Sequence, residues 1–95
     1  MIRFSTNWEK LGWTIFTTIR KNTHSKLVGQ IHTIRTPDGD FKAKIIGLYP
    51  IKKIEITDDL AFADADMTKD GLIRLLEGWY GKEFDDYVLI TLWAI

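Results

Sequence analysis

The stretch Pro37-Asp38-Gly39-Asp40 separates two segments that are rich in β-forming residues, and it predicts a tight hairpin turn. Proline presets one backbone angle of a turn, and an Asp-Gly pair suits the positive φ that hairpin turns require. After the turn, apolar residues expected to face inward alternate with basic residues expected to face outward: Phe41, Ala43 and Ile45 against Lys42 and Lys44. We therefore predict that residues 29–36 and the segment after the turn form an antiparallel pair of strands.

Gly47 interrupts the apolar run that continues this second strand. A glycine inside a strand is typical of a bulge, or of a sharp bend at the corner of a small barrel. Pro50 cannot donate a backbone hydrogen bond, so it predicts an edge or the end of a strand. We expect a further short strand at residues 51–56.

A short helix is expected next, because Thr57 or Asp58 can cap it. We expect this helix to end at Phe62 or Ala65. Near the end of the chain, residues 87–95 are apolar on both faces and rich in β-forming residues. This pattern predicts a central strand that is covered on each side.

A longer helix is expected over residues 69–80, with Thr68 as its cap and Gly81 as its end. Apolar residues recur in it at the spacing of one helix face: Leu72, Leu75, Leu76, Trp79 and Tyr80. We predict that the helix packs through the Leu72, Leu76 and Trp79 part of that face.

The first part of the chain predicts a short strand at residues 1–6, a short helix through Leu11, and a strand at residues 14–20. Trp8 and Trp13 are expected to be core or half-buried residues. Short, numerous strands with a glycine-marked bend indicate an α+β fold. We predict one domain over residues 1–95, a small PUA-like, partly open mixed β-barrel with helices packed on one side.

The composition excludes several classes of protein. The 95 residues are 45% hydrophobic and include no cysteine, so they can form one core but no disulfide framework or thiolate metal site. No apolar run is long enough to cross a bilayer, and none follows the first residues as it does in a secretion signal. We therefore expect a soluble, cytoplasmic protein with no membrane partner.

Charge is segregated along the chain although the net charge is zero. Residues 20–53 contain eight Lys or Arg and two Asp, a net charge of +6. Residues 54–95 contain three Lys or Arg and ten Asp or Glu, a net charge of −7. The basic half suggests a polyanionic partner, and the alternative is that the two halves attract one another or are both solvated.

The stretch Phe16-Thr17-Thr18-Ile19-Arg20-Lys21 is the main candidate for a functional site. In a strand, Thr18 and Arg20 share one face, so a hydroxyl and a guanidinium lie side by side. Lys21 belongs to the opposite face, and a polar loop follows at residues 22–25. The simpler interpretation is an edge strand whose threonines pack and whose charges are solvated.

Together with Gly29, the predicted hairpin and the helix before the last strand, this stretch resembles the ASCH domains, which are small relatives of the PUA domain. The resemblance covers residues 14–95. It implies a PUA-like β-barrel with a cleft between barrel and helices, lined partly by the Thr-x-Arg strand. It also implies RNA or a nucleotide as the ligand. Many ASCH-like domains have Gly-Asp where this chain has Gly29-Gln30.

One branch of that family hydrolyses the amide of an acetylated cytidine, using a lysine on the strand and a glutamate on the helix. In this chain the matching positions hold Ile15 and Gly71. Neither residue can activate water or move a proton. Asp70 is adjacent to Gly71 and could substitute for the glutamate after a shift of one position.

Other catalytic and metal sites find little support in the sequence. His24 and His32 lack the spacing of a metal site, and no serine lies in a nucleophile elbow. We interpret an acidic run as helix caps and solvated faces: Asp58, Asp59, Asp64, Asp66 and Asp70. Three aromatic residues could stack RNA bases, although residues of this kind more often belong to the core: Phe41, Tyr49 and Trp13.

The sequence therefore predicts an RNA- or nucleotide-binding module that is not catalytic and uses no cofactor or metal. The expected binding residues are Thr18, Arg20, Lys21, Lys26, Lys42 and Lys44. The alternative is a small amidohydrolase that acts on a modified, acetylated cytidine with altered catalytic residues, among them Thr18, Lys21 or Asp70. The oligomeric state stays open.

Overall fold

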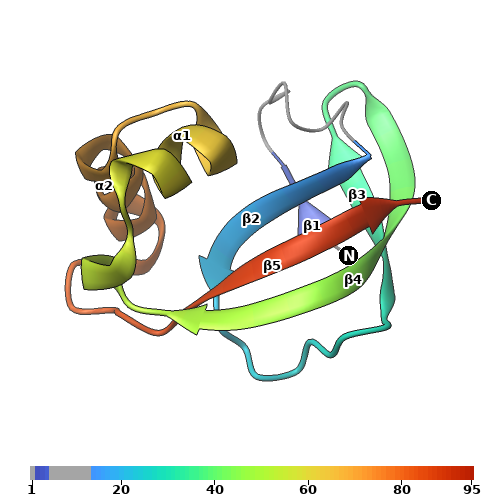
Figure 1. Ribbon diagram of the computed structural model, residues 1–95, viewed down its shortest axis with the longest axis horizontal. Helices are drawn as coiled ribbons and strands as arrows, with labels where there is room; N and C mark the ends of the chain where they lie inside the picture. Colours follow the sequence, from blue (N-terminus) through green and yellow to red (C-terminus); the bar gives the residue numbers. More distant parts are fainter. Residues whose placement is uncertain (1, 5–13) are drawn as a thin grey trace.

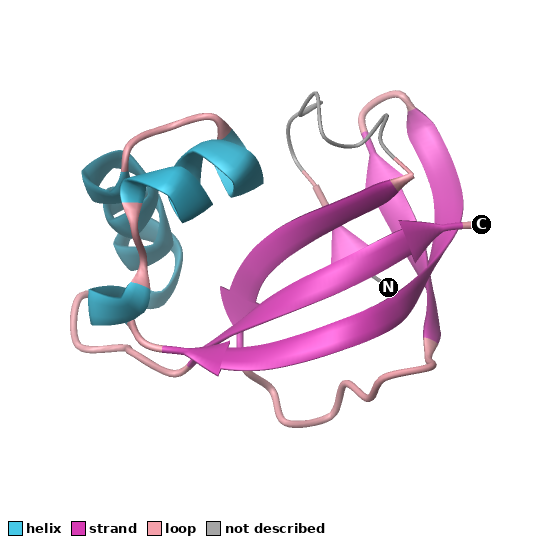
Figure 2. Cartoon of the chain, in the orientation of Figure 1, coloured by secondary structure: helices cyan, strands magenta, loops and turns pink. Residues whose placement is uncertain are grey.

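The computed structural model describes residues 2–4 and 14–95, which form one curled, five-stranded mixed sheet with two helices at one end (Figures 1 and 2). The strands are β1 (Ile2–Arg3), β2 (Ile15–Lys21), β3 (Ile31–Thr36), β4 (Gly39–Ile51) and β5 (Tyr87–Ala94). The helices are the 3-10 turn η2 (Lys53–Glu55), α1 (Asp58–Ala65) and α2 (Lys69–Tyr80). The strand order is β1-β3-β4-β5-β2, and only the β1–β3 pair is parallel. This half-barrel confirms the predicted α+β class.

The β3–β4 hairpin forms where the turn residues predict it. Thr36 pairs with Gly39, and Gly39 has the positive φ of 130° that a glycine accommodates. Ala43 and Ile45 are buried, while Lys42 is exposed on the opposite face. The predicted inward and outward positions of this strand are therefore confirmed.

The predicted irregularity at Gly47 is a β-bulge, since the β4–β5 register shifts between Ile45 and Gly47. A Cβ atom at Gly47 would lie 3.4 Å from the Cβ of Thr91 on the neighbouring strand, so little room exists for a side chain. Bulges bend a strand and increase its twist, which lets the long β4 curl around the core. Pro50 lies one residue before the end of β4, as predicted.

The strand β5 is central, between β4 and β2. Its inner face is buried in the half-barrel together with β2, β3 and β4, through Phe16, Ile34, Ala43, Ile45, Val88, Ile90 and Leu92. A second core lies on the outer face, where Ile19, Ile51 and Tyr87 pack against Ala61, Leu72 and Leu76 of the helices. The helices cover only this end of the outer face. The prediction that β5 is covered on both sides is thus wrong at its other end, where Trp93 is 48% exposed.

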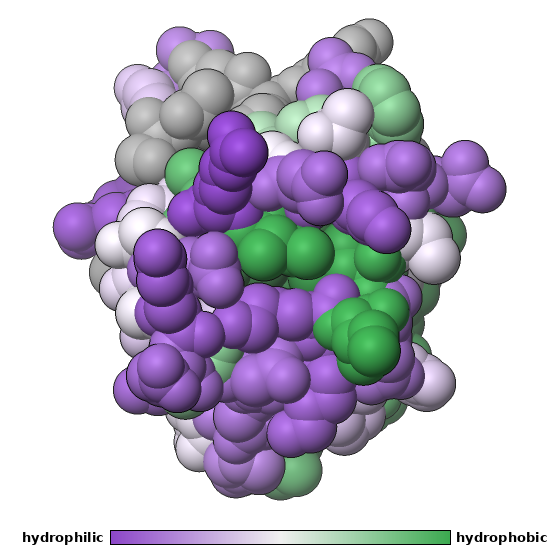
Figure 3. Space-filling model, turned by 90° about the vertical axis from the view of Figure 1, so that its left-hand side faces the viewer, coloured by the Kyte–Doolittle hydropathy of each residue, from purple (hydrophilic) through white to green (hydrophobic). Residues whose placement is uncertain are grey.

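Both helices begin and end at the predicted residues. The Thr57 hydroxyl accepts from the Leu60 amide of α1, and the Thr68 hydroxyl accepts from the Gly71 amide of α2, each at 3.2 Å. Gly81 ends α2 with a φ of 95°. Their solvent side is mostly hydrophilic, with apolar side chains gathered near its centre (Figure 3). Within the described ranges, no helix is long and apolar enough to span a bilayer.

The predicted strand at residues 51–56 does not form; β4 ends at Ile51 and a 3-10 turn follows. The Lys52 amide donates to the Glu55 carboxylate (2.8 Å), and the Lys53 amide donates to the Asp85 carboxylate (2.7 Å). These side chains satisfy backbone donors that a strand would need for its ladder. The helix predicted through Leu11, together with Trp8 and Trp13, lies outside the described residues.

Candidate functional site

A cavity of about 270 Å³ lies where the open seam of the half-barrel meets the helices. The seam separates β1 and β2, the two ends of the sheet among the described strands. We call this cavity the seam pocket. Its walls come from β1 and the residue after it (Arg3, Phe4), from β2 (Thr18, Ile19, Arg20), from α1 (Asp64, Ala65) and from α2 (Leu72, Leu75, Leu76, Trp79, Tyr80).

Arg20 holds the two sides of the seam together. Its Nε donates to the Thr18 hydroxyl (3.1 Å), and its Nη2 donates to the Arg3 carbonyl on β1 (2.6 Å). The guanidinium carbon lies 4.6 Å from the centre of the Phe4 ring, within cation–π range. Burial lowers the pKa of Arg20, and the nearby Tyr80 and Asp64 oppose that shift. Arginine stays charged in proteins even when it is partly buried, so the pocket contains a partly desolvated cation.

Asp64 brings a buried carboxyl group to the same pocket. It is only 4% exposed and accepts a hydrogen bond from the Thr17 hydroxyl at 3.0 Å. The interpretation of Asp64 as part of a solvated acidic face is therefore wrong. It follows Ala61 by three positions, so it lies on the side of α1 that faces the sheet. The three-residue spacing between Ala61 and Asp64 was the sequence signal that could have predicted the burial of Asp64.

Trp79 and Tyr80 form an aromatic wall at the end of α2. Their rings meet edge to face, with centroids 6.2 Å apart. Leu72 and Leu76 are buried as predicted, but Trp79 is 53% exposed and borders the pocket instead of filling the core. The prediction that Trp79 packs with the two leucines is thus wrong, since the helix turns this position toward the seam.

The seam pocket combines features that suit a planar, polar ligand. An exposed indole and a phenol offer ring faces, while Arg20, Thr18 and Asp64 offer donors and acceptors for ring edges. No protein-family model, curated protein or solved structure gives a significant match to the chain. The chemistry of the pocket must therefore be inferred from its own residues.

The predicted binding residues divide among four places, one of which is a second cavity lined by Lys26. Thr18 and Arg20 line the seam pocket, as the face pattern of β2 predicts. The Lys21 Nζ lies 5.4 Å from the centre of the Phe84 ring, on the outer face of the sheet. Lys42 and Lys44 are on the outer face of β4, away from the seam. The four lysines do not surround the pocket, so the basic segment forms no single surface beside it.

Lys26 lines a second cavity, of about 260 Å³, at the mouth of the half-barrel. The loop that follows β2 forms its rim, and Leu48, Pro50 and Val88 form its floor. The His24 ring nitrogen Nε2 lies 2.8 Å from the Asp86 carboxylate, which ties the loop to the start of β5. The His24 side chain on this rim is 69% exposed, so the cavity opens to solvent.

The positions that match the amidohydrolase branch lie outside the seam pocket. Ile15 is on the outer face of the sheet, opposite Trp93. Gly71 is in the first turn of α2, and Asp70 beside it is exposed. Among the residues that the structure describes, no cluster of three or more His, Asp or Glu side chains could hold a metal ion.

Proposed function

We propose that the protein binds RNA or a nucleotide without chemical turnover, and that the seam pocket holds one nucleobase. The observation that supports this proposal is the half-exposed Trp79 ring beside Arg20, Thr18 and Asp64. Proteins that recognise single-stranded RNA stack a base on an aromatic side chain and hydrogen-bond its edge. A partly desolvated arginine can grip a base edge or a phosphate in two places.

The size of the pocket also favours a small planar group. Ligand pockets commonly occupy about 300–1,000 Å³, and the seam pocket, at about 270 Å³, lies just below that range. A base or nucleoside fits this volume better than an extended cofactor. The resemblance to the ASCH domains points to the same ligand class, with the Thr-x-Arg strand lining the cleft.

Binding without catalysis is preferred to the amidohydrolase alternative. Ile15, Gly71 and Asp70 do not line the pocket, so no residue at the matched positions can act on a ligand there. Clear turnover of acetylated cytidine by the purified protein, lost in Thr18→Ala, would contradict this proposal.

The test is a pair of variants titrated with nucleoside monophosphates and with short labelled single-stranded RNAs. Trp79→Ala removes the indole of the aromatic wall, and we expect binding to weaken by about 1–3 kcal/mol, the value of one base–aromatic stack. Phe62→Ala is the matched control, because Phe62 is 54% exposed on α1 and does not line the pocket. Equal affinities of the two variants and the wild type would refute a base site at the seam.

A further inference from the structure

The end of the outer sheet face that the helices leave open contains one row of four directly opposed residues. In the pairing register, Ile31 is opposite Lys44, Lys44 is opposite Trp93, and Trp93 is opposite Ile15. The row therefore crosses β3, β4, β5 and β2 in turn. Neighbouring strands lie about 4.8 Å apart, so the row spans about 14 Å.

The apolar members of this row are exposed to solvent. Ile31 is 57% exposed, Ile15 is 53% exposed and Trp93 is half-exposed, although β5 is the central strand. At the other end of the same face, Tyr87 of β5 is fully buried by the helices. The Trp93 indole lies open on the sheet surface between Lys44 and Ile15, so it is available to a planar group.

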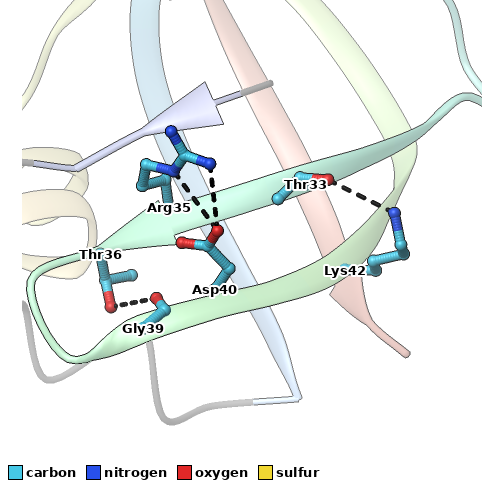
Figure 4. A network of polar contacts seen from close by, with 6 residues as sticks. All are labelled: Thr33, Arg35, Thr36, Gly39, Asp40 and Lys42. Carbon is cyan, nitrogen blue, oxygen red and sulfur yellow. Dashed lines mark hydrogen bonds and ion pairs between the residues drawn. The ribbon is translucent and has the colours of Figure 1, made fainter.

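The charges on this part of the face are predominantly positive. Arg35, Lys42 and Lys44 face outward, and the Asp40 carboxylate on the same two strands binds Arg35 at 3.2 Å (Figure 4). Lys42 lies beside Thr33, with its Nζ 3.4 Å from the hydroxyl. The residues that β5 and β2 add at this end are uncharged: Thr17, Thr91, Ile15 and Trp93. Asp40 lies two positions before Lys42 on the same face but is paired with Arg35, and no ion pair of Lys42 or Lys44 is described.

We propose that single-stranded RNA binds across this face, which we call the sheet platform: Ile15, Ile31, Thr33, Lys42, Lys44 and Trp93. One base stacks on Trp93, and phosphates contact Lys42 and Lys44 on the next strand. The Thr33 hydroxyl can donate to a phosphate or accept from a ribose hydroxyl. This inference rests on the proposed function, and it assigns to the polymer a surface that is separate from the seam pocket.

Charge complementarity favours RNA over a second copy of this chain. A two-fold pairing of the sheet platform would place the lysines of both copies in one interface, and like charges oppose such a contact. A polyanion instead neutralises both lysines while its bases cover the apolar row.

The experiment compares a labelled oligouridylate of about ten nucleotides with uridine monophosphate, each titrated at several salt concentrations. Trp93→Thr keeps a β-forming residue and should weaken oligouridylate binding about 5- to 150-fold, the effect of one lost stack. Binding of uridine monophosphate should not change, because Trp93 does not line the seam pocket. Tyr49→Thr is the matched control, since Tyr49 is an exposed strand aromatic opposite Leu89, outside the platform.

A charge variant tests the same surface without altering an apolar residue. Lys42→Gln with Lys44→Gln should reduce the slope of log affinity on log salt by about 1.4, which is two phosphate contacts to a single strand. Lys69→Gln with Lys82→Gln, two exposed lysines elsewhere, removes the same charge and should leave the slope nearly unchanged. If Trp93→Thr lowers the melting temperature too far to be assayed, the comparison of these two double-lysine variants still tests the platform.

The outcomes separate this inference from the proposed function. Oligouridylate binding that falls in Trp79→Ala but not in the platform variants would overturn the platform and leave the base site standing. No binding of either ligand by the wild type at low salt would overturn both. A wild-type dimer that becomes monomeric in Trp93→Thr would show that the face pairs with itself, and would also overturn the platform.

Discussion

The two ends of the sheet's outer face share the same strands and differ in what covers them. At one end, Ile19, Ile51 and Tyr87 are buried beneath α1 and α2. At the other end, Ile15 and Trp93 continue the same strand faces and lie open to solvent. The comparison teaches that the period of a strand sets the face of each residue, while the position of the helices decides whether that face is a core or a solvent-exposed surface.

The largest expected effect is at the covered end. Leu76 is fully buried between α2 and the sheet, so Leu76→Ala should lower the free energy of unfolding by about 2–5 kcal/mol. A denaturant melt monitored by circular dichroism measures this loss. A change below about 0.5 kcal/mol would mean that the helices do not form a core with the sheet.

An intermediate effect is expected at the boundary between the two ends. Thr17 lies between Ile15 and Ile19 along β2, and its hydroxyl donates to the buried carboxyl group of Asp64. Thr17→Val removes this bond and should cost about 1–3 kcal/mol of stability, since a buried polar group loses a partner. Thr91→Val, opposite it on β5, is the matched control, because no hydrogen bond of the Thr91 side chain is described. Equal losses in the two variants would show that the bond does not anchor α1.

The smallest effect is expected at the open end. Ile15→Thr keeps a β-branched residue at a half-exposed site, so the free energy of unfolding should change by less than about 0.5 kcal/mol. The same melt measures it. A loss comparable with that of Leu76→Ala would show that the open end is covered in solution, and it would remove the distinction between the two ends.

Local signals predicted the parts of the fold that depend on neighbouring residues. The hairpin turn, the Gly47 bulge and both helix caps each follow from a few adjacent positions, and the structure has them where the sequence places them. The residues 51–56 were the exception. Asp85 bonds the Lys53 amide from 32 positions away, and no local pattern reveals that partner.

The candidate site was predictable only in part. The strand period placed Thr18 and Arg20 on one face, and both line the seam pocket. Asp64 and Trp79 were assigned to other roles, because burial of one and exposure of the other depend on how the helices meet the seam. Charge segregation along the chain also did not become a single surface. Lys21 lies at one end of the outer sheet face, Lys42 and Lys44 lie at the other end, and Lys26 lies in a loop.

The pairing of β2 with β5 has a consequence for the order of folding. Thr36 and Gly39 close the hairpin across a short turn, whereas Thr18 pairs with Ile90, a separation of 72 positions. Contacts between distant positions form late, because closing a long loop costs entropy before any pairing repays it. Arg20 reaches the Arg3 carbonyl from β2, and β2 joins the described sheet through β5 alone. A chain that has formed only the hairpin therefore has no seam pocket, and the pocket is complete only after the most distant pairing among the described strands has formed.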